Sequence, residues 1–113
     1  MSQILPSNIS TVKSPGFVVI YRWRLKPGKE EQFRIAWSQV TQSLLLRGSQ
    51  GSRLHRSHDG LWYAYAQWPS ATAREYAFAQ PATDTGASNA MKDAIEEYFP
   101  EIVLDVVADF LVD

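Results

Sequence analysis

The sequence predicts an α+β domain of the ferredoxin-like type, with the element order β-α-β-β-α-β, a four-stranded antiparallel sheet and helices on one face. Three patterns lead to this prediction. Residues 17–25 and 102–112 alternate between two faces, as half-buried strands do. Residues 29–47 carry apolar side chains at helical spacing. An Asp-Gly pair at residues 59–60 is typical of a tight turn between two further strands.

The first strand and the first helix have clear apolar faces. The wholly apolar or aromatic face of the strand consists of Phe17, Val19, Tyr21, Trp23 and Leu25. The apolar stripe of the helix consists of Phe33, Ala36, Trp37, Val40 and Leu44. Gly48 lies just beyond this helix and is expected to end it. The two faces predict that the helix covers one side of the sheet.

Two more helical segments are expected in the second half of the chain. After a hairpin formed by residues 52–58 and 61–68, Ser70 is expected to cap a short helix. Ser88 is expected to cap another helix over residues 89–99. Together they form the second helical region of the predicted order.

Composition excludes several classes of protein. The chain has 113 residues, of which 45% are hydrophobic and 20% charged, so we expect one globular domain over residues 17–113. Residues 1–16 lack a period and are expected to form an extended arm, not a secretory signal. A net charge of −1 argues against nucleic-acid binding, and no apolar run is long enough for a membrane span. A cytoplasmic location is therefore expected.

The second face of the sheet predicts a homodimer. On this face the first strand carries Val18, Ile20, Arg22 and Arg24, and the last strand carries Val103, Asp105, Val107, Asp109 and Leu111. Such a face is too apolar to remain in water and too charged for the core of a monomer. A partner sheet packed against it resolves the conflict. We also expect ion pairs between the two arginines and the two aspartates.

Four short motifs carry a resemblance to a known family. They are Lys26-Pro27-Gly28-Lys29-Glu30, Leu54-His55-Arg56-Ser57, Asp59-Gly60 and Trp68-Pro69-Ser70. On these motifs the chain from Phe17 to Val112 resembles the antibiotic-biosynthesis monooxygenase family of dimeric α/β barrels. The resemblance implies a monooxygenase that uses no cofactor and acts on a small aromatic, quinol or polyketide-type compound. In such enzymes the deprotonated ring of the substrate supplies the first electron to molecular oxygen.

The resemblance also implies site residues. Trp68 matches a substrate-binding Trp at the end of the third strand, and Tyr76 is the nearest counterpart of a proton-handling Tyr on the helix that follows. Independently of the resemblance, the pattern of aromatic residues makes Tyr21 and Trp37 candidates to line the same cavity around a flat aromatic ligand. His55 is a candidate general base, because imidazole exchanges protons near neutral pH.

Haem and metal ions do not fit the sequence. Haem-degrading members of this family use an Asn on the first strand and a His in the second helical region, but residues 17–25 contain no Asn and residues 70–99 contain no His. The chain has only two histidines, His55 and His58. Their spacing on a strand points them to opposite faces, so no metal site is expected.

The sequence leaves open whether the aromatic residues wall a pocket or fill a core. The neighbouring small residues Ala64, Ala66, Ala73 and Ala77 favour open space. If the core is filled, the chain is a non-catalytic dimeric ligand-binding or accessory protein of the same fold. A hydrolase or isomerase in the same barrel is a third possibility.

Overall fold

A computed structural model of the chain describes residues 16–81 and 84–112. Apart from Gly16, the predicted arm over residues 1–16 lies outside the described residues. The elements are β1 (Phe17–Leu25), α2 (Glu30–Leu45), β2 (Ser52–Arg56), β3 (Trp62–Trp68), α3 (Ala71–Ala79), α4 (Thr85–Ala94), β4 (Ile95–Tyr98) and β5 (Ile102–Asp105). None of the helices in the described part is long and apolar enough to span a membrane.

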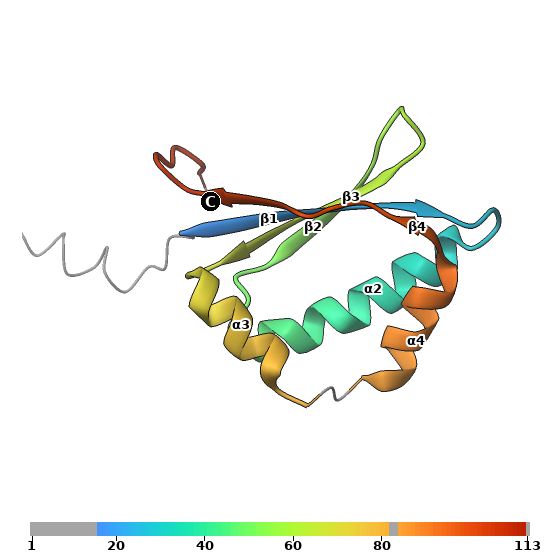
Figure 1. Ribbon diagram of the computed structural model, residues 1–113, viewed down its shortest axis with the longest axis horizontal. Helices are drawn as coiled ribbons and strands as arrows, with labels where there is room; N and C mark the ends of the chain where they lie inside the picture. Colours follow the sequence, from blue (N-terminus) through green and yellow to red (C-terminus); the bar gives the residue numbers. More distant parts are fainter. Residues whose placement is uncertain (1–15, 82–83, 113) are drawn as a thin grey trace, which may run out of the picture.

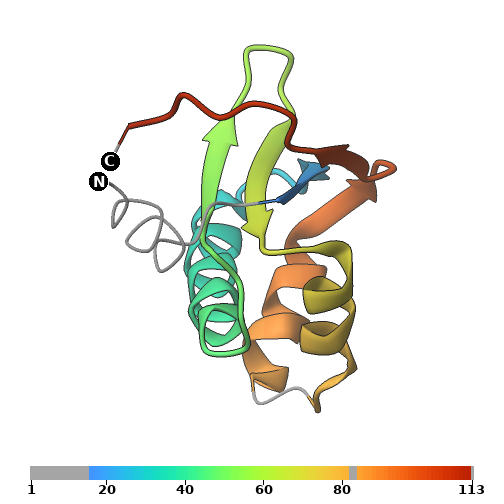
Figure 2. The same cartoon turned by 90° about the vertical axis from the view of Figure 1, so that its left-hand side faces the viewer.

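The five strands form one antiparallel sheet, and the helices cover one of its faces (Figure 1). The strand order is β2-β3-β1-β4, and β5 also pairs with β1. The two last strands share one edge of β1, because β5 lies beside its first half and β4 beside its second half. Figure 2, viewed from the side, shows the sheet above and the helices below. The predicted ferredoxin-like α+β fold is confirmed.

The core lies between the sheet and the helices and consists of two clusters. The first contains Trp23, Leu25, Phe33, Ala64, Ala94 and Ile95, and the second contains Phe17, Val19, Ala66, Trp68 and Ala77. Phe33 of α2 packs edge-on against Trp23 of β1, with ring centroids 5.0 Å apart. The predicted apolar face of the first strand therefore packs against the predicted stripe of the helix.

The helix expected over residues 89–99 is wrong in both of its bounds. Helix α4 begins earlier, with Asp84 and not Ser88 at its N-cap position, and it ends at Ala94. Residues Ile95–Tyr98 form strand β4 against the second half of β1. The free edge of β1 offers these residues a set of backbone hydrogen bonds, and this tertiary pairing overrides their local helical spacing.

The last strand is shorter than expected, and its faces are reversed. It ends at Asp105, which pairs with the first residue of β1, so the rest of residues 102–112 has no further length of β1 beside it. Leu104 pairs with Val18, whereas Asp105 pairs with Phe17 on the helix-covered side. Cross-strand partners share a face, so Leu104, and not Asp105, lies on the outer face.

This register also makes the expected ion pairs wrong. Asp105 lies opposite Phe17, at the far end of β1 from the two arginines. Arg24 instead pairs with Glu97 of β4 at 3.1 Å, and Arg22 donates to the carbonyl oxygen of Pro100 at 3.0 Å.

An ion pair fastens the start of α2 to α4. The Asp93 carboxylate accepts hydrogen bonds from Lys29 at 2.8 Å and from Gln32 at 3.0 Å. The hydrogen bond from Lys29, followed by that from Gln32, lowers the pKa of Asp93 to about 2.

This pKa predicts an acid-side loss of stability. A lowered pKa stabilises the fold above the unfolded-state pKa of about 4, and the effect disappears as the pH falls towards 2. The Asp93→Asn variant should therefore lose less stability than the wild type over this pH range, as measured by urea unfolding. Asp105→Asn, which changes an exposed aspartate, is the control. Equal pH slopes for the wild type and Asp93→Asn would contradict this account.

Candidate functional site

An open hollow of about 670 Å³ lies between the sheet and α3. Its lining residues are Tyr21, Arg74, Glu75, Phe78, Ala79 and Glu101. Strand β1 supplies Tyr21 from its helix-covered face, opposite the small residue Ala64 of β3. Arg74 and Phe78 lie one turn apart on α3 and so project from the same side of that helix. The segment between β4 and β5 supplies Glu101.

Local sequence fixes the position of α3. Its N-cap residue Ser70 is extended, and the Ser70 hydroxyl accepts a hydrogen bond from the backbone N–H of Ala73 at 3.0 Å. This cap satisfies one of the free N–H groups at the start of the helix. It begins the helix directly after Trp68-Pro69, so that Arg74 falls in its first half.

Arg74 is the centre of the polar contacts in this hollow. Its Nε and Nη2 atoms donate to the Tyr21 hydroxyl oxygen at 3.3 and 3.0 Å. Its Nη2 atom also lies 2.9 Å from both carboxylate oxygens of Glu101. The guanidinium carbon lies 5.6 Å from the ring centre of Tyr21 and 5.3 Å from that of Phe78. Arg74 is thus a fixed cation between two aromatic rings.

The Tyr21 hydroxyl is a hydrogen-bond donor at neutral pH. Burial raises the pKa of Tyr21 above its usual value of 10.0, although Arg74 acts in the opposite direction. The guanidinium of Arg74 has only donors, so the Tyr21 oxygen accepts from it and the phenolic proton is left to donate to another acceptor. Tyr21 and Arg74 together can therefore donate to an oxygen atom of a ligand in the hollow.

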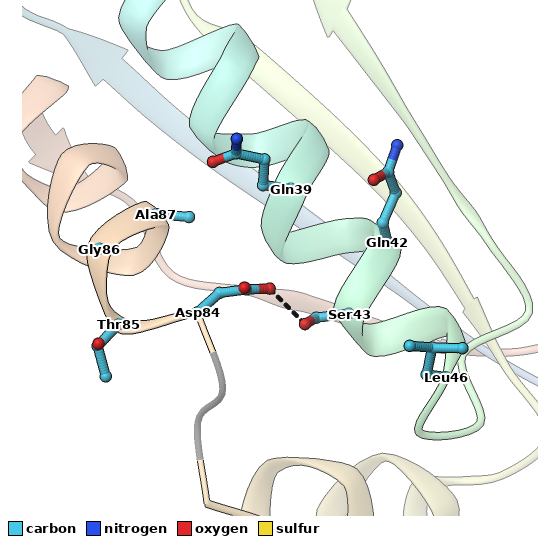
Figure 3. A pocket seen from close by; sticks show the side chains of 8 residues that line it. All are labelled: Gln39, Gln42, Ser43, Leu46, Asp84, Thr85, Gly86 and Ala87. Atoms are coloured by element: carbon cyan, nitrogen blue, oxygen red, sulfur yellow. Dashed lines mark hydrogen bonds between the residues drawn. The ribbon is translucent and has the colours of Figure 1, made fainter.

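A second hollow, of about 510 Å³, lies between the end of α2 and the start of α4 (Figure 3). It is lined by Gln39, Gln42, Ser43, Leu46, Asp84, Thr85, Gly86 and Ala87. The Ser43 hydroxyl is hydrogen-bonded to the Asp84 carboxylate across it. The described residues that line it include neither an aromatic ring nor a cation, so it is a poorer match for an aromatic anion than the first hollow.

The three residues expected to bind a substrate do not all lie together. Tyr21 lines the first hollow. Trp68 is 1% exposed and packs in the second core cluster, with its ring centre 5.8 Å from that of Phe78. It packs against Phe78, which lines the hollow, but does not itself line it. Trp37 is half-buried and packs on the other cluster, around Trp23.

Trp68 also carries an unpaired polar atom. Its indole Nε1 is buried and has no hydrogen-bond partner among the described residues. An unpaired buried donor is unfavourable, so a water molecule or a ligand oxygen that reached it would gain a hydrogen bond.

The two residues expected to handle protons lie away from this hollow. Tyr76 is on α3 but is 67% exposed, and it follows Arg74 by two residues, which turns it towards a different side of the helix. His55 is exposed on β2, next to Leu54, which packs against the helix-covered core. Side chains alternate along a strand, so His55 faces away from the helices. Their catalytic roles remain predictions.

Metal-binding geometry is absent from the described residues. Within residues 16–81 and 84–112, no group of three or more His, Asp or Glu side chains could hold an ion.

Arg74, Phe78 and Glu101 are the residues central to this site that sequence reasoning missed. The available signal was the spacing of Arg74 and Phe78, four apart on a short helix otherwise rich in alanine. Nothing in the local sequence connects Arg74 with Glu101, which follows it by 27 residues.

Comparisons with known proteins relate this geometry to solved structures. No protein-family model matches the chain, and no curated protein is similar to it at a significant level. Solved structures of similar fold include SnoaB, a cofactor-independent oxygenase from Streptomyces nogalater. It has a TM-score of 0.70 and 14% identity, and the alignment covers 86% of this chain and 98% of SnoaB.

Two further structures are candidate antibiotic biosynthesis monooxygenases. The one from Bordetella bronchiseptica has a TM-score of 0.70 and 19% identity, covering 84% of this chain and 100% of that chain. The one from Caulobacter crescentus has a TM-score of 0.67 and 18% identity, covering 89% and 99%. At these identities the likeness concerns the fold. The chain has the fold of the antibiotic biosynthesis monooxygenase structures.

Proposed function

We propose that this chain is a cofactor-independent monooxygenase of a small aromatic, quinol or polyketide-type compound, and that the substrate binds in the hollow beside Arg74. One observation carries this proposal: a fixed cation and a protonated phenol, Arg74 and Tyr21, meet at a wall that also carries the Phe78 ring. The fold, which is also that of the cofactor-independent oxygenase SnoaB, supports it.

Arg74 and Tyr21 would stabilise the substrate as an anion. A phenol or anthrone in the hollow places its oxygen near the guanidinium and the Tyr21 hydroxyl, and the positive charge favours loss of a proton to water in the open hollow. The electron-rich anion then reduces molecular oxygen. In the overall reaction of an anthrone, a CH₂ group and O₂ become a carbonyl group and water, so the substrate is oxidised and oxygen is reduced.

Oxygen consumption tests this proposal. Purified protein treated with a chelator should consume oxygen saturably with at least one compound from a panel of hydroquinones and anthrones. The absence of both oxygen uptake and any shift in melting temperature across the panel would contradict the proposal and favour a non-catalytic accessory protein.

The Tyr21→Phe variant tests the position of the site. It keeps the aromatic ring and removes one neutral hydrogen bond to the anion, so kcat/KM should fall about tenfold. Tyr76→Phe and His55→Gln are informative comparisons. If either of these causes the larger loss, the proton chemistry lies at the residue expected from the sequence and not at Tyr21.

The alternative is a ligand-binding or accessory protein without catalysis. It is favoured by the Glu101 carboxylate, which already satisfies Arg74 in the structure. A compound that raises the melting temperature without being oxidised would support this alternative.

We also propose that the chain is a homodimer, formed through the sheet face opposite the helices. On this outer face Ile20 of β1 pairs with Tyr65 of β3, and Val18 of β1 pairs with Leu104 of β5. Residues 106–112 lie on the same side of the sheet (Figures 1 and 2). Their apolar side chains are 74–95% exposed: Val107, Phe110, Leu111 and Val112. So much exposed apolar surface is typical of an interface.

Sedimentation equilibrium measures this assembly. The full chain should be a stable dimer at micromolar concentration, with on the order of 2,000 Å² buried in total. A variant that ends at Asp105 should dissociate into monomers. A full-length chain that sediments as a monomer would contradict the dimer.

A further inference from the structure

The Glu101 carboxylate occupies the position in which Arg74 would hold an anionic ligand. We infer that Arg74 anchors the carboxylate of an aromatic acid, and that Glu101 fills this anchor in the free protein and is displaced when the acid binds. The inference takes the location of the site from the proposed function but does not depend on turnover.

The contacts show that a carboxylate fits against Arg74 without disturbing Tyr21. Both Glu101 oxygens lie 2.9 Å from Nη2 of Arg74. The Nε and Nη2 atoms of the same guanidinium still reach the Tyr21 hydroxyl. A ligand carboxylate can therefore replace that of Glu101 one for one, while the contact between Arg74 and Tyr21 is kept.

Of the two residues in the ion pair, Glu101 is the one that a ligand can displace. The Glu101 side chain is 44% exposed, against 20% for Arg74, and it lies in the irregular segment between β4 and β5. A released Glu101 carboxylate is solvated by water, so breaking the pair leaves no buried charge. Ion pairs exposed to this degree contribute little to stability, so the pair is easily broken.

The walls of the hollow favour an acid that carries a flat aromatic ring. Phe78 and Tyr21 present aromatic rings beside the guanidinium, and Ala79 leaves space next to them. A flat ring whose carboxylate points at Arg74 can contact these walls, whereas an aliphatic acid would gain less from them. The hollow, of about 670 Å³, has room for two fused rings.

Binding of 2-naphthoate and its neutral analogue 2-naphthamide, measured by calorimetry, tests this inference. Glu101→Gln removes the competing carboxylate, so 2-naphthoate should bind about fivefold more tightly than to the wild type, while 2-naphthamide should be unaffected. Glu97→Gln is the matched control, because it makes the same charge change in an exposed ion pair with Arg24. Arg74→Met should abolish the preference for the acid over the amide.

Two results would overturn the inference. One is an equal change in 2-naphthoate affinity for Glu101→Gln and Glu97→Gln, which would reduce the effect to net charge. The other is a wild-type protein that binds the acid and the amide equally well. A lack of oxygen uptake would count against the proposed monooxygenase alone, because these binding measurements need no turnover.

Discussion

Replacing Arg74 by methionine should lower kcat/KM for oxygen consumption by about a hundredfold or more, because a positioned cation that stabilises developing negative charge is worth this much. Methionine keeps part of the aliphatic bulk of the side chain and removes the charge. Arg34→Met is the matched control, because Arg34 is an exposed arginine of α2 that pairs with Glu31. It should leave turnover unchanged.

The melting temperature separates catalysis from folding in this experiment. Arg74→Met leaves Glu101 without its partner, but that carboxylate is partly exposed and can be hydrated. The variant should therefore stay folded at the assay temperature. Full activity in a folded Arg74→Met variant would rule out Arg74 as the group that stabilises the substrate anion.

The largest effect on stability is expected at Trp68. Trp68→Ala should lower the free energy of unfolding by about 3–5 kcal/mol, because it leaves a large cavity in a core where this side chain is 1% exposed. Denaturant unfolding measures the loss. Trp37→Ala should cost less, because Trp37 is only half-buried at the edge of the other cluster.

Trp68→Phe distinguishes a core residue from a ligand-binding one. It keeps an aromatic ring but removes the indole N–H, which has no partner among the described residues. If a ligand oxygen reaches this atom, the variant should bind the substrate more weakly, while its melting temperature falls less than that of Trp68→Ala. A Trp68→Ala variant as stable as the wild type would contradict the packing described for the second core cluster.

The first half of the fold was predictable because its patterns are regular. The alternation through β1 and the spacing of Phe33 and Ala36 on α2 each match a single type of element. The second half was less predictable. Met91, Ala94 and Ile95 fit a helical stripe, and the change to a strand at Ile95 depends on the free edge of β1, which local sequence does not reveal.

The length of β5 also depends on its pairing with β1, which is distant in the sequence. Residues 102–112 alternate throughout, but β1 begins at Phe17 and pairs only as far as Asp105. The same register brings Glu97 to Arg24. Charge partners across a sheet follow register, so a wrong register gives wrong ion pairs.

The candidate site was predictable only in part. Tyr21 followed from the apolar face of β1, and a pocket near Trp68 followed from the junction between β3 and α3. The choice between Arg74 and Tyr76 depends on the rotation of a short helix, which the sequence does not determine. The contact between Arg74 and Glu101 depends on how the segment between β4 and β5 passes the end of α3.

If this hollow is the site of a cofactor-independent monooxygenase, one atom of molecular oxygen enters the aromatic substrate. Incubation of the chelator-treated protein with an anthrone under isotopically labelled oxygen gas, followed by mass spectrometry of the product, identifies the source of that atom. We expect one labelled oxygen atom in the quinone product with the wild type, and loss of product formation with Arg74→Met. A product without label, or equal labelling by both proteins, would contradict the proposal.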